Sequence, residues 1–339
     1  MSSRKGLIRL AKVVVSLGLI LFLIIKISPG KLLLNLRNID PIILSGAFIV
    51  FFISSLLGSF QWHLLLRGGG VYLPFKDSFK LYFVGLFFNN FLPANVGGDA
   101  VKIYDVVRVG NDPYRVFAIT LLDRVVGITG LCILALFATL VIRTGEGLIN
   151  LNLYTLIFIA CVVPVFILAT TSTVSKGLRR LIGSIGLWGI GTRFNQVLDH
   201  LSEFKRLRTL LIKVVFVALV VQSLRIATHM VVANALNIEL HPFNVFHFFI
   251  FIPLLGLIMI LPISINGLGV REGAGILLFT QIGFSSEQAL LMEFITYFVM
   301  VVVSMIGGVF FITRNISRSM QPDESSESVS YTHLTLPTK

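Results

Sequence analysis

Six apolar stretches, each long enough to cross a lipid bilayer, constrain this chain more than any other feature of its sequence. A transmembrane helix needs about 20 consecutive apolar residues. Only 13% of the 339 residues are charged, against about 25% in soluble domains. The sequence therefore predicts an all-α polytopic membrane protein. The predicted spans are Ile8–Ile27, Ile42–Leu66, Val116–Ile142, Leu151–Ala169, Leu210–Ala235 and Ala289–Ile312.

The distribution of basic residues predicts the orientation of the spans. The formal net charge of +12 does not indicate nucleic-acid binding here, because cytoplasmic loops of membrane proteins collect Lys and Arg. A basic run from Lys176 to Lys213 predicts a cytoplasmic loop. Within it, Arg193–Arg208 is either a plain basic loop or an amphipathic helix on anionic headgroups. Both termini are then cytoplasmic, in a multi-pass protein of the cell (inner) membrane.

Two shorter apolar stretches contain similar helix breaks. The first break runs from Leu92 to Lys102 and the second from Leu261 to Arg271, and they align without gaps. This alignment places Lys102 over Arg271, one turn after the expected helix start. The residues predicted to break the helices are Pro93, Gly97, Gly98, Pro262, Gly267 and Gly269.

Each break predicts a re-entrant hairpin, since the basic loops put both ends of the stretch on one side of the membrane. The hairpins are Phe75–Phe91 with Gly98–Val109, and Val245–Leu261 with Val270–Gln281. Each half of the chain then reads span, span, hairpin, span. The first half starts inside and the second outside, which predicts an inverted-topology repeat of the kind found in many transporters.

The expected domain organisation is one integral membrane domain over residues 1–316. Its first repeat covers about residues 8–142 and its second about residues 151–312. Residues 317–328 are polar and predicted to be disordered. Residues 329–339 resemble the translation of a sequencing-library adapter, so we leave them out of the fold and the function.

Charged side chains inside the predicted membrane region are candidates for substrate binding. A charge at the bilayer centre costs about 2.5–3.5 kcal/mol or more, so such residues are usually functional or paired internally. Internal pairing would join Asp123 to an Arg of a neighbouring helix, or Glu293 to Arg271. The candidates are Asp99, Lys102, Asp123, Arg124, Arg225, Arg271, Glu272 and Glu293.

The segments Gly97-Gly98-Asp99 and Gly267-Leu268-Gly269 precede the expected new helix starts. Free N–H groups and the positive end of a helix dipole favour a phosphate there. An alternative hypothesis for Asp99 is that it caps its helix. Inverted repeats bring broken helices together near the midplane, so we expect both helix starts and both cations to contribute to one anion site.

Gln222, Arg225 and His229 share one face of a predicted helix. His229 is either a hydrogen-bonded packing residue or a proton relay. The sequence contains no nucleotide-binding loop, metal-ligand pattern or catalytic triad, and Cys132 and Cys161 lie in apolar runs. We therefore expect no cofactor and no metal, while energy from protons and facilitated movement both remain open.

Three stretches together resemble the membrane region of lysylphosphatidylglycerol synthases, the flippase-like or UPF0104 family. They are Leu92-Pro93 through Asp99, Asp123-Arg124-Val125-Val126-Gly127, and Leu261-Pro262 through Glu272. The resemblance covers roughly Gly6 to Ile312. Full-length synthases of this kind add a soluble aminoacyltransferase domain that moves lysine from lysyl-tRNA to phosphatidylglycerol. This sequence has no room for that domain, so the resemblance implies the lipid-moving part rather than the enzyme.

The resulting functional expectation is a lipid translocase in cell-envelope lipid metabolism. Its partner is a membrane lipid, either an anionic phospholipid or a polyprenyl-phosphate-linked lipid. One alternative is the membrane component of a lipid-modifying enzyme, similar to phosphatidylglycerol lysyltransferase, acting with a separate enzyme partner. Another is a secondary transporter for a small solute, which would need a closed central site instead of one open to the bilayer.

Overall fold

A computed structural model describes residues 38–91, 97–142, 153–160, 190–259, 267 and 269–313, and this part of the chain is helical without any strand. The helix predicted at Ile8–Ile27 lies outside the described residues, as do the tail after Thr313 and most of Leu151–Ala169. Pro93 and Pro262 also lie outside them. Residues 153–160 are helical.

Four helices in the described part are long and apolar enough to cross a membrane, namely α3, α6, α10 and α13. They coincide with four of the six predicted spans. Their apolar outer surfaces suit contact with lipid, since side chains such as Phe137, Phe216 and Ile312 are exposed. The helices are α3 (Pro41–Gly68), α4 (Phe75–Phe91), α5 (Gly97–Val107), α6 (Pro113–Ile142), α9 (Ile190–Glu203), α10 (Arg208–Ala235), α11 (Pro242–Ile258), α12 (Val270–Phe279) and α13 (Ser286–Thr313), with 3-10 turns at η2 (Phe204–Arg206) and η4 (Thr280–Ile282).

Local sequence signals explain where the long helices begin. The Asp40 carboxylate accepts hydrogen bonds from the backbone N–H groups of Ile42 and Ile43, at 2.8 and 3.1 Å. Pro41 occupies the first position of α3, where a missing N–H costs nothing. Asp112 caps α6 in the way that Asp40 caps α3, since its carboxylate accepts a hydrogen bond from the N–H of Arg115 at 3.1 Å. The helix α6 also begins with a proline.

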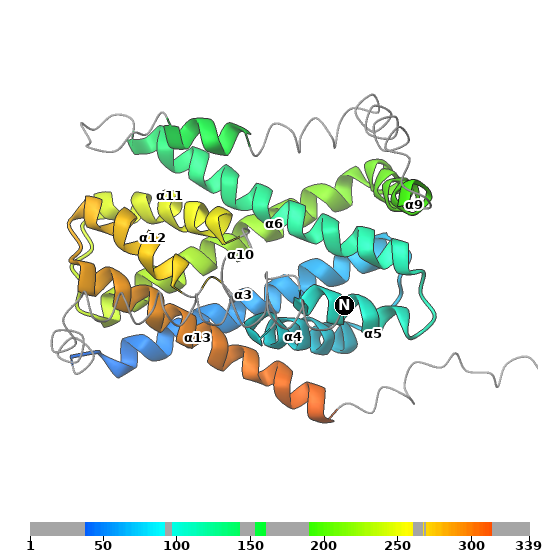
Figure 1. The fold of residues 1–339 in the computed structure, drawn as a ribbon, viewed down its shortest axis with the longest axis horizontal. Helices are drawn as coiled ribbons and strands as arrows, with labels where there is room; N and C mark the ends of the chain where they lie inside the picture. Colours follow the sequence, from blue (N-terminus) through cyan, green and yellow to red (C-terminus); the bar gives the residue numbers. More distant parts are fainter. Residues whose placement is uncertain are drawn as a thin grey trace, which may run out of the picture.

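The helices pack in a pattern that is the same in both halves of the chain. α3 packs along α10, α4 packs against α13, and α11 packs against α6. If α3 is exchanged with α10, α4 with α11, α5 with α12 and α6 with α13, the α3–α10 contact maps onto itself. Each other main packing contact among these helices then maps onto a second one. The α4–α5 pair lies at the end of the bundle where α3 ends, and the α11–α12 pair lies at the opposite end (Figure 1).

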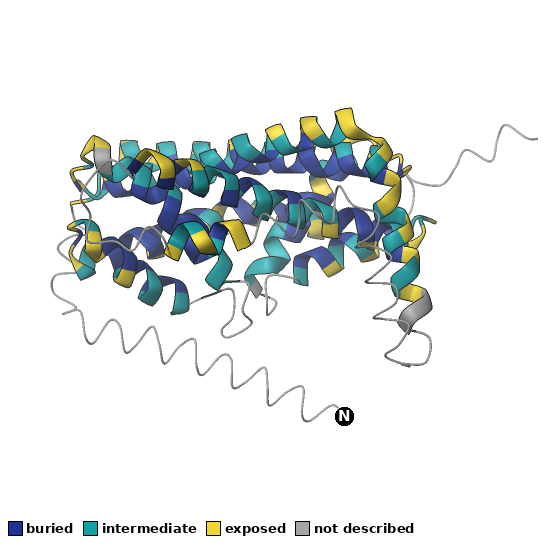
Figure 2. Ribbon diagram, turned by 90° about the horizontal axis from the view of Figure 1, so that it is seen from above, coloured by how far each residue is buried: buried dark blue, intermediate teal, exposed yellow. Residues whose placement is uncertain are grey.

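Glycines allow the short helices to approach their neighbours closely. A Cβ atom on Gly98 of α5 would collide with the backbone carbonyl of Gly85 in α4, and a Cβ on Gly307 of α13 would collide with the carbonyl of Phe83. Small residues at such crossings let helix backbones touch, as in other membrane bundles. The buried residues of the long helices lie on the sides that face the other helices (Figure 2).

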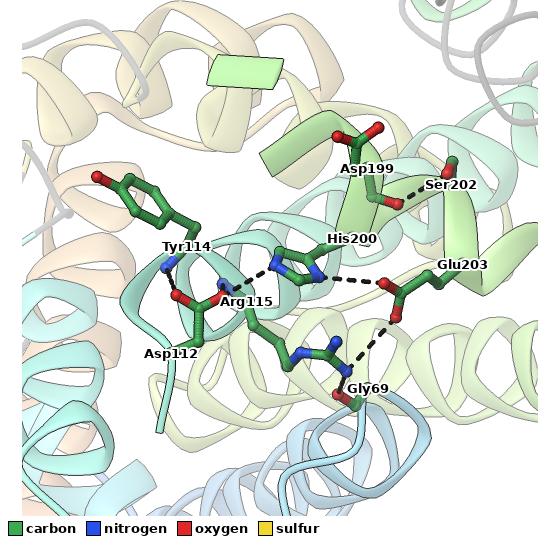
Figure 3. A network of polar contacts seen from close by, with 8 residues as sticks. All are labelled: Gly69, Asp112, Tyr114, Arg115, Asp199, His200, Ser202 and Glu203. Atoms are coloured by element: carbon green, nitrogen blue, oxygen red, sulfur yellow. Dashed lines mark hydrogen bonds and ion pairs between the residues drawn. The ribbon is translucent and has the colours of Figure 1, made fainter. Parts of the chain in front are cut away.

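Part of the basic segment is the helix α9, which packs against α6, and the predicted contact with anionic headgroups stays a prediction. A polar network fixes it to the start of α6 (Figure 3). His200 Nε2 lies 2.9 Å from Asp112 Oδ2, and its Nδ1 lies 3.2 Å from Glu203 Oε1. Arg115 donates to the Gly69 carbonyl at 2.7 Å and lies 3.4 Å from Glu203. The network therefore joins α9 to the ends of α3 and α6.

Candidate functional site

Lys102 of α5 is buried and surrounded by groups that compensate its charge. Its Nζ lies 2.9 Å from Asp99 Oδ1, one turn earlier on the same helix. It also lies over two aromatic rings, 5.0 Å from the centroid of Trp62 and 5.2 Å from that of Tyr82. The other oxygen of Asp99 forms an ion pair with Arg124 Nε of α6. The two rings thus compensate Lys102 through cation–π contacts, and Lys102 shares the Asp99 carboxylate with the partly buried Arg124.

The start of α5 is organised by α4. The Gly98 N–H donates to Asn89 Oδ1 at 2.8 Å, which satisfies one of the free N–H groups of the helix start. Gly85 leaves room for the aliphatic part of Lys102, since a Cβ there would lie 2.8 Å from Lys102 Cγ. One N–H group that the sequence assigned to a phosphate is therefore already bonded to a side chain.

Two further charged side chains lie close to Lys102. Asp123 Oδ1 accepts a hydrogen bond from Gln61 Nε2 at 2.7 Å, and Asp123 interacts electrostatically with Lys102 and Arg225. Arg225 of α10 donates to the Tyr82 hydroxyl at 3.4 Å. These contacts join the charged residues into one group, which we call the α5 cluster: Asp99, Lys102, Asp123, Arg124 and Arg225.

Arg225 has the weakest compensation in this cluster. Within the described residues, no carboxylate lies within 4.0 Å of its guanidinium, and its buried Nε has no hydrogen-bond partner. It lies about 5 Å from the middle of α10, at a rise of 1.5 Å per residue. With every group ionised, three cations face two carboxylates in the α5 cluster, so its described members carry a net charge of +1.

A second group, the α12 cluster, contains Arg271, Glu272, Glu293 and His229. Arg271 lies 2.6 Å from Glu272 and 3.4 Å from Glu293, and its guanidinium stacks over the Tyr297 ring at 4.7 Å. Glu272 also accepts from the Gly269 N–H at 2.6 Å, which closes the first turn of α12. Gly269 has a φ of 83°, a conformation that favours glycine.

His229 of α10 connects the two clusters. Its Nε2 lies 3.6 Å from Glu293 Oε2, while its Nδ1 lies 3.1 Å from the backbone carbonyl of Arg225, one turn earlier. Gly275 of α12 provides the space for Glu293, because a Cβ there would lie 2.8 Å from Glu293 Cγ. The face formed by Gln222, Arg225 and His229 therefore contacts three helices, since Gln222 donates to the Gly127 carbonyl of α6 at 3.1 Å.

The structure pairs several candidates differently from the sequence-based expectations. Glu293 does lie beside Arg271, but the hydrogen bond to Asp123 comes from Gln61. Asp99 pairs with cations, and α5 already begins at Gly97. Arg271 is in the first turn of α12, so only Lys102 lies a full turn after its helix start.

Lys102 and Arg271 each have their own carboxylates and rings, in two clusters that α10 joins. Sequence reasoning missed the roles of Gln61, Tyr82 and Asn89, which only the packing of α3 and α4 against their neighbours reveals. No group of His, Cys, Asp and Glu within the described residues is arranged to hold a metal ion.

Two comparisons with known proteins found matches that cover most of the chain. The model of the family described as lysylphosphatidylglycerol synthase TM region matches residues 9–308. A UPF0104 membrane protein from Methanothermobacter thermautotrophicus is 25% identical over 283 residues, which cover 78% of this chain and 82% of the relative. The family match spans the two clusters.

Proposed function

Because the chain belongs to the lysylphosphatidylglycerol synthase transmembrane-region family, we propose that this multi-pass membrane protein moves a lipid with an anionic headgroup between leaflets. The lipid is an anionic phospholipid or a polyprenyl-phosphate-linked lipid of the cell envelope. A membrane helix bundle with charged side chains in its interior supports this proposal, since such charges mark substrate pathways.

The observation that carries the proposal is the weakly compensated charge of Arg225. It places a guanidinium inside the bundle with only a long hydrogen bond to a neutral phenol and no carboxylate within 4.0 Å among the described residues. Such a cation is costly in a membrane unless a ligand compensates it. A phosphodiester carries a single negative charge and accepts hydrogen bonds from a guanidinium fork. One such headgroup would neutralise the net charge of the α5 cluster.

An inverted-topology repeat supports a carrier mechanism. The proposed repeats cover about residues 8–142 and 151–312, and they include α3 to α6 and α10 to α13. They belong to a proposed fold of six spans and two re-entrant hairpins with both termini in the cytoplasm. The support is the exchange symmetry of the helix contacts and the position of the two short-helix pairs at opposite ends of the bundle. In such folds one half moves against the other around a site between them.

The test is lipid exchange in vesicles that contain the purified protein. Arg225→Ala should lower the rate for fluorescent phosphatidylglycerol by about 13- to 160-fold, which corresponds to about 1.5–3 kcal/mol for a charge-assisted hydrogen bond. Arg225→Lys should retain part of the rate, since the charge survives without the fork. Arg206→Ala removes an exposed cation of η2 and serves as the control.

The outcome of this test separates the candidate functions. Equal exchange of phosphatidylglycerol and phosphatidylcholine would contradict recognition of an anionic headgroup. A wild-type protein that exchanges no lipid but carries a soluble anion across the vesicle membrane would support a small-solute transporter instead. Normal exchange by folded Arg225→Ala would remove Arg225 from the site.

A further inference from the structure

Two hydrogen-bond acceptors face each other between α10 and α13. His229 Nδ1 lies 3.1 Å from the Arg225 carbonyl, and because a carbonyl can only accept, Nδ1 carries the ring proton. In the neutral ring Nε2 is then a bare acceptor. It lies 3.6 Å from Glu293 Oε2. An ionised carboxylate and a bare ring nitrogen repel at this distance, whereas a single proton on either one makes the contact favourable.

The burial of Glu293 also favours a proton at this contact. Its side chain is 0% exposed, and neither carboxylate oxygen has a hydrogen-bond partner within the described residues. Arg271 is closer to Glu272, at 2.6 Å, than to Glu293, at 3.4 Å. With a neutral His229 and both glutamates ionised, the α12 cluster carries an excess negative charge. A buried carboxylate that shares its one cation with a second carboxylate is only partly compensated, and a proton would remove the excess charge.

The surrounding helices leave few other groups to consider. α12 brings Arg271 and Glu272 to the site, and α10 brings His229 and the backbone carbonyl of Arg225. On α13 itself, Tyr297 lies under Arg271. α3 and α4 also pack against α13, but no charged side chain described on them lies within 4.0 Å of Glu293. A proton bound at this contact would therefore lie between His229 and Glu293.

We propose that His229 and Glu293 form a proton-binding site whose proton is linked to binding of the anionic headgroup, an inference that rests on the proposed function. The two ligands lie one helical turn apart, because His229 follows Arg225 by four residues and its ring bonds the Arg225 carbonyl. A phosphate at Arg225 and a proton at His229 attract each other. Each raises the affinity for the other by the same factor, as thermodynamic linkage requires.

The proposed step needs no bond change other than proton binding. The acid form of the buffer supplies the proton and is left as its conjugate base, the pair shares the proton, and no other atom is transferred. One monoanionic headgroup and one proton together carry no net charge. Their joint movement is therefore independent of the membrane potential and responds to a pH difference across the membrane. Affinity for the headgroup should fall as pH rises through the titration of the pair, by up to about tenfold per pH unit for one linked proton.

The first experiment counts the protons. Calorimetric titration of the purified protein with short-chain phosphatidylglycerol, in buffers with different ionisation heats, gives the number of protons taken up per lipid. The wild type should take up as much as one. Glu293→Gln keeps the shape but cannot ionise, so its proton uptake should vanish and its affinity should no longer depend on pH. Glu239→Gln, at an exposed carboxylate between α10 and α11, should behave as wild type.

A second variant keeps the test decisive if Glu293→Gln does not fold. His229→Gln places an amide donor beside Glu293, which can then remain ionised without a proton, so proton uptake should vanish here too. Lipid binding by the wild type without proton uptake would overturn the proton site and leave the proposed function standing.

If the wild type binds no anionic lipid, the proposed function fails and the linkage fails with it. The proton site is then tested alone, through the infrared band of a protonated carboxylic acid and the nitrogen resonances of the imidazole. Titration of either signal with pH, lost in Glu293→Gln, would support the site. Absence of both titrations would overturn it.

Discussion

Individual residues show how this chain accommodates charge in an apolar interior. Asp99 holds two cations, Lys102 and Arg124, while the Trp62 and Tyr82 rings cover Lys102. The charged residues themselves can be identified from the sequence, because any charge in an apolar stretch stands out. Their neutral partners cannot, because an aromatic residue or a Gln in an apolar helix has no contrast with its surroundings. The roles of Trp62 and Tyr82 therefore emerge only from the packing.

Asp99 should be essential for stability. Asp99→Asn leaves two cations close together without their carboxylate, and breaking a buried ion pair costs about 3–5 kcal/mol. Asp77→Asn removes the partner of the partly exposed Lys80, 3.8 Å away, and should cost at most about 1 kcal/mol. Thermal unfolding of both variants in the same detergent measures the difference. Equal melting temperatures would mean that Asp99 does not stabilise the fold.

Among the helices, the sequence predicts the boundaries of α4 but does not establish that α9 is a helix. The sequence predicts the stretch Phe75–Phe91 with the bounds that α4 has, since Pro74 precedes it and Pro93 follows. The helix α9 could not be separated from a plain basic loop. Its amphipathic pattern is short, and the contacts of Asp112 and Arg115 that hold it come from distant parts of the chain.

Gly98 should be required for the packing of α5 on α4. In Gly98→Ala the new Cβ meets the backbone carbonyl of Gly85, which cannot move aside as a side chain could. We expect a lower melting temperature and less monodisperse protein in size-exclusion chromatography. Gly273→Ala is the matched control, since no atom lies within 4 Å of a Cβ there and Ala favours the helix by about 0.5–1 kcal/mol. A Gly98→Ala protein as stable as Gly273→Ala would contradict the close contact.

For the whole molecule, the sequence predicts that the two halves are related but does not show how their charged residues are connected. The two similar breaks, with Lys102 aligned to Arg271, predict that the halves are related. The alignment does not show every ion pair, since Glu293 comes from another helix than Arg271 and Arg124 from another helix than Asp99. The link through Arg225 and His229 depends on α10 lying between the clusters.

The topology of the inverted repeat can be tested with single cysteines in a background that lacks Cys132 and Cys161. Tyr72 and Arg108 flank the α4–α5 pair, and Glu239 and Ser285 flank the α11–α12 pair, all at exposed positions. We expect cysteines at the first two positions to be labelled by a membrane-impermeant maleimide from the cytoplasmic side, and the other two from the outside. Each short-helix pair then enters and leaves the membrane on one side, because neither α5 nor α12 is long enough to cross it. Labelling of Tyr72→Cys and Arg108→Cys from different sides would show that the α4–α5 pair crosses the membrane, and labelling of all four from one side would remove the inversion.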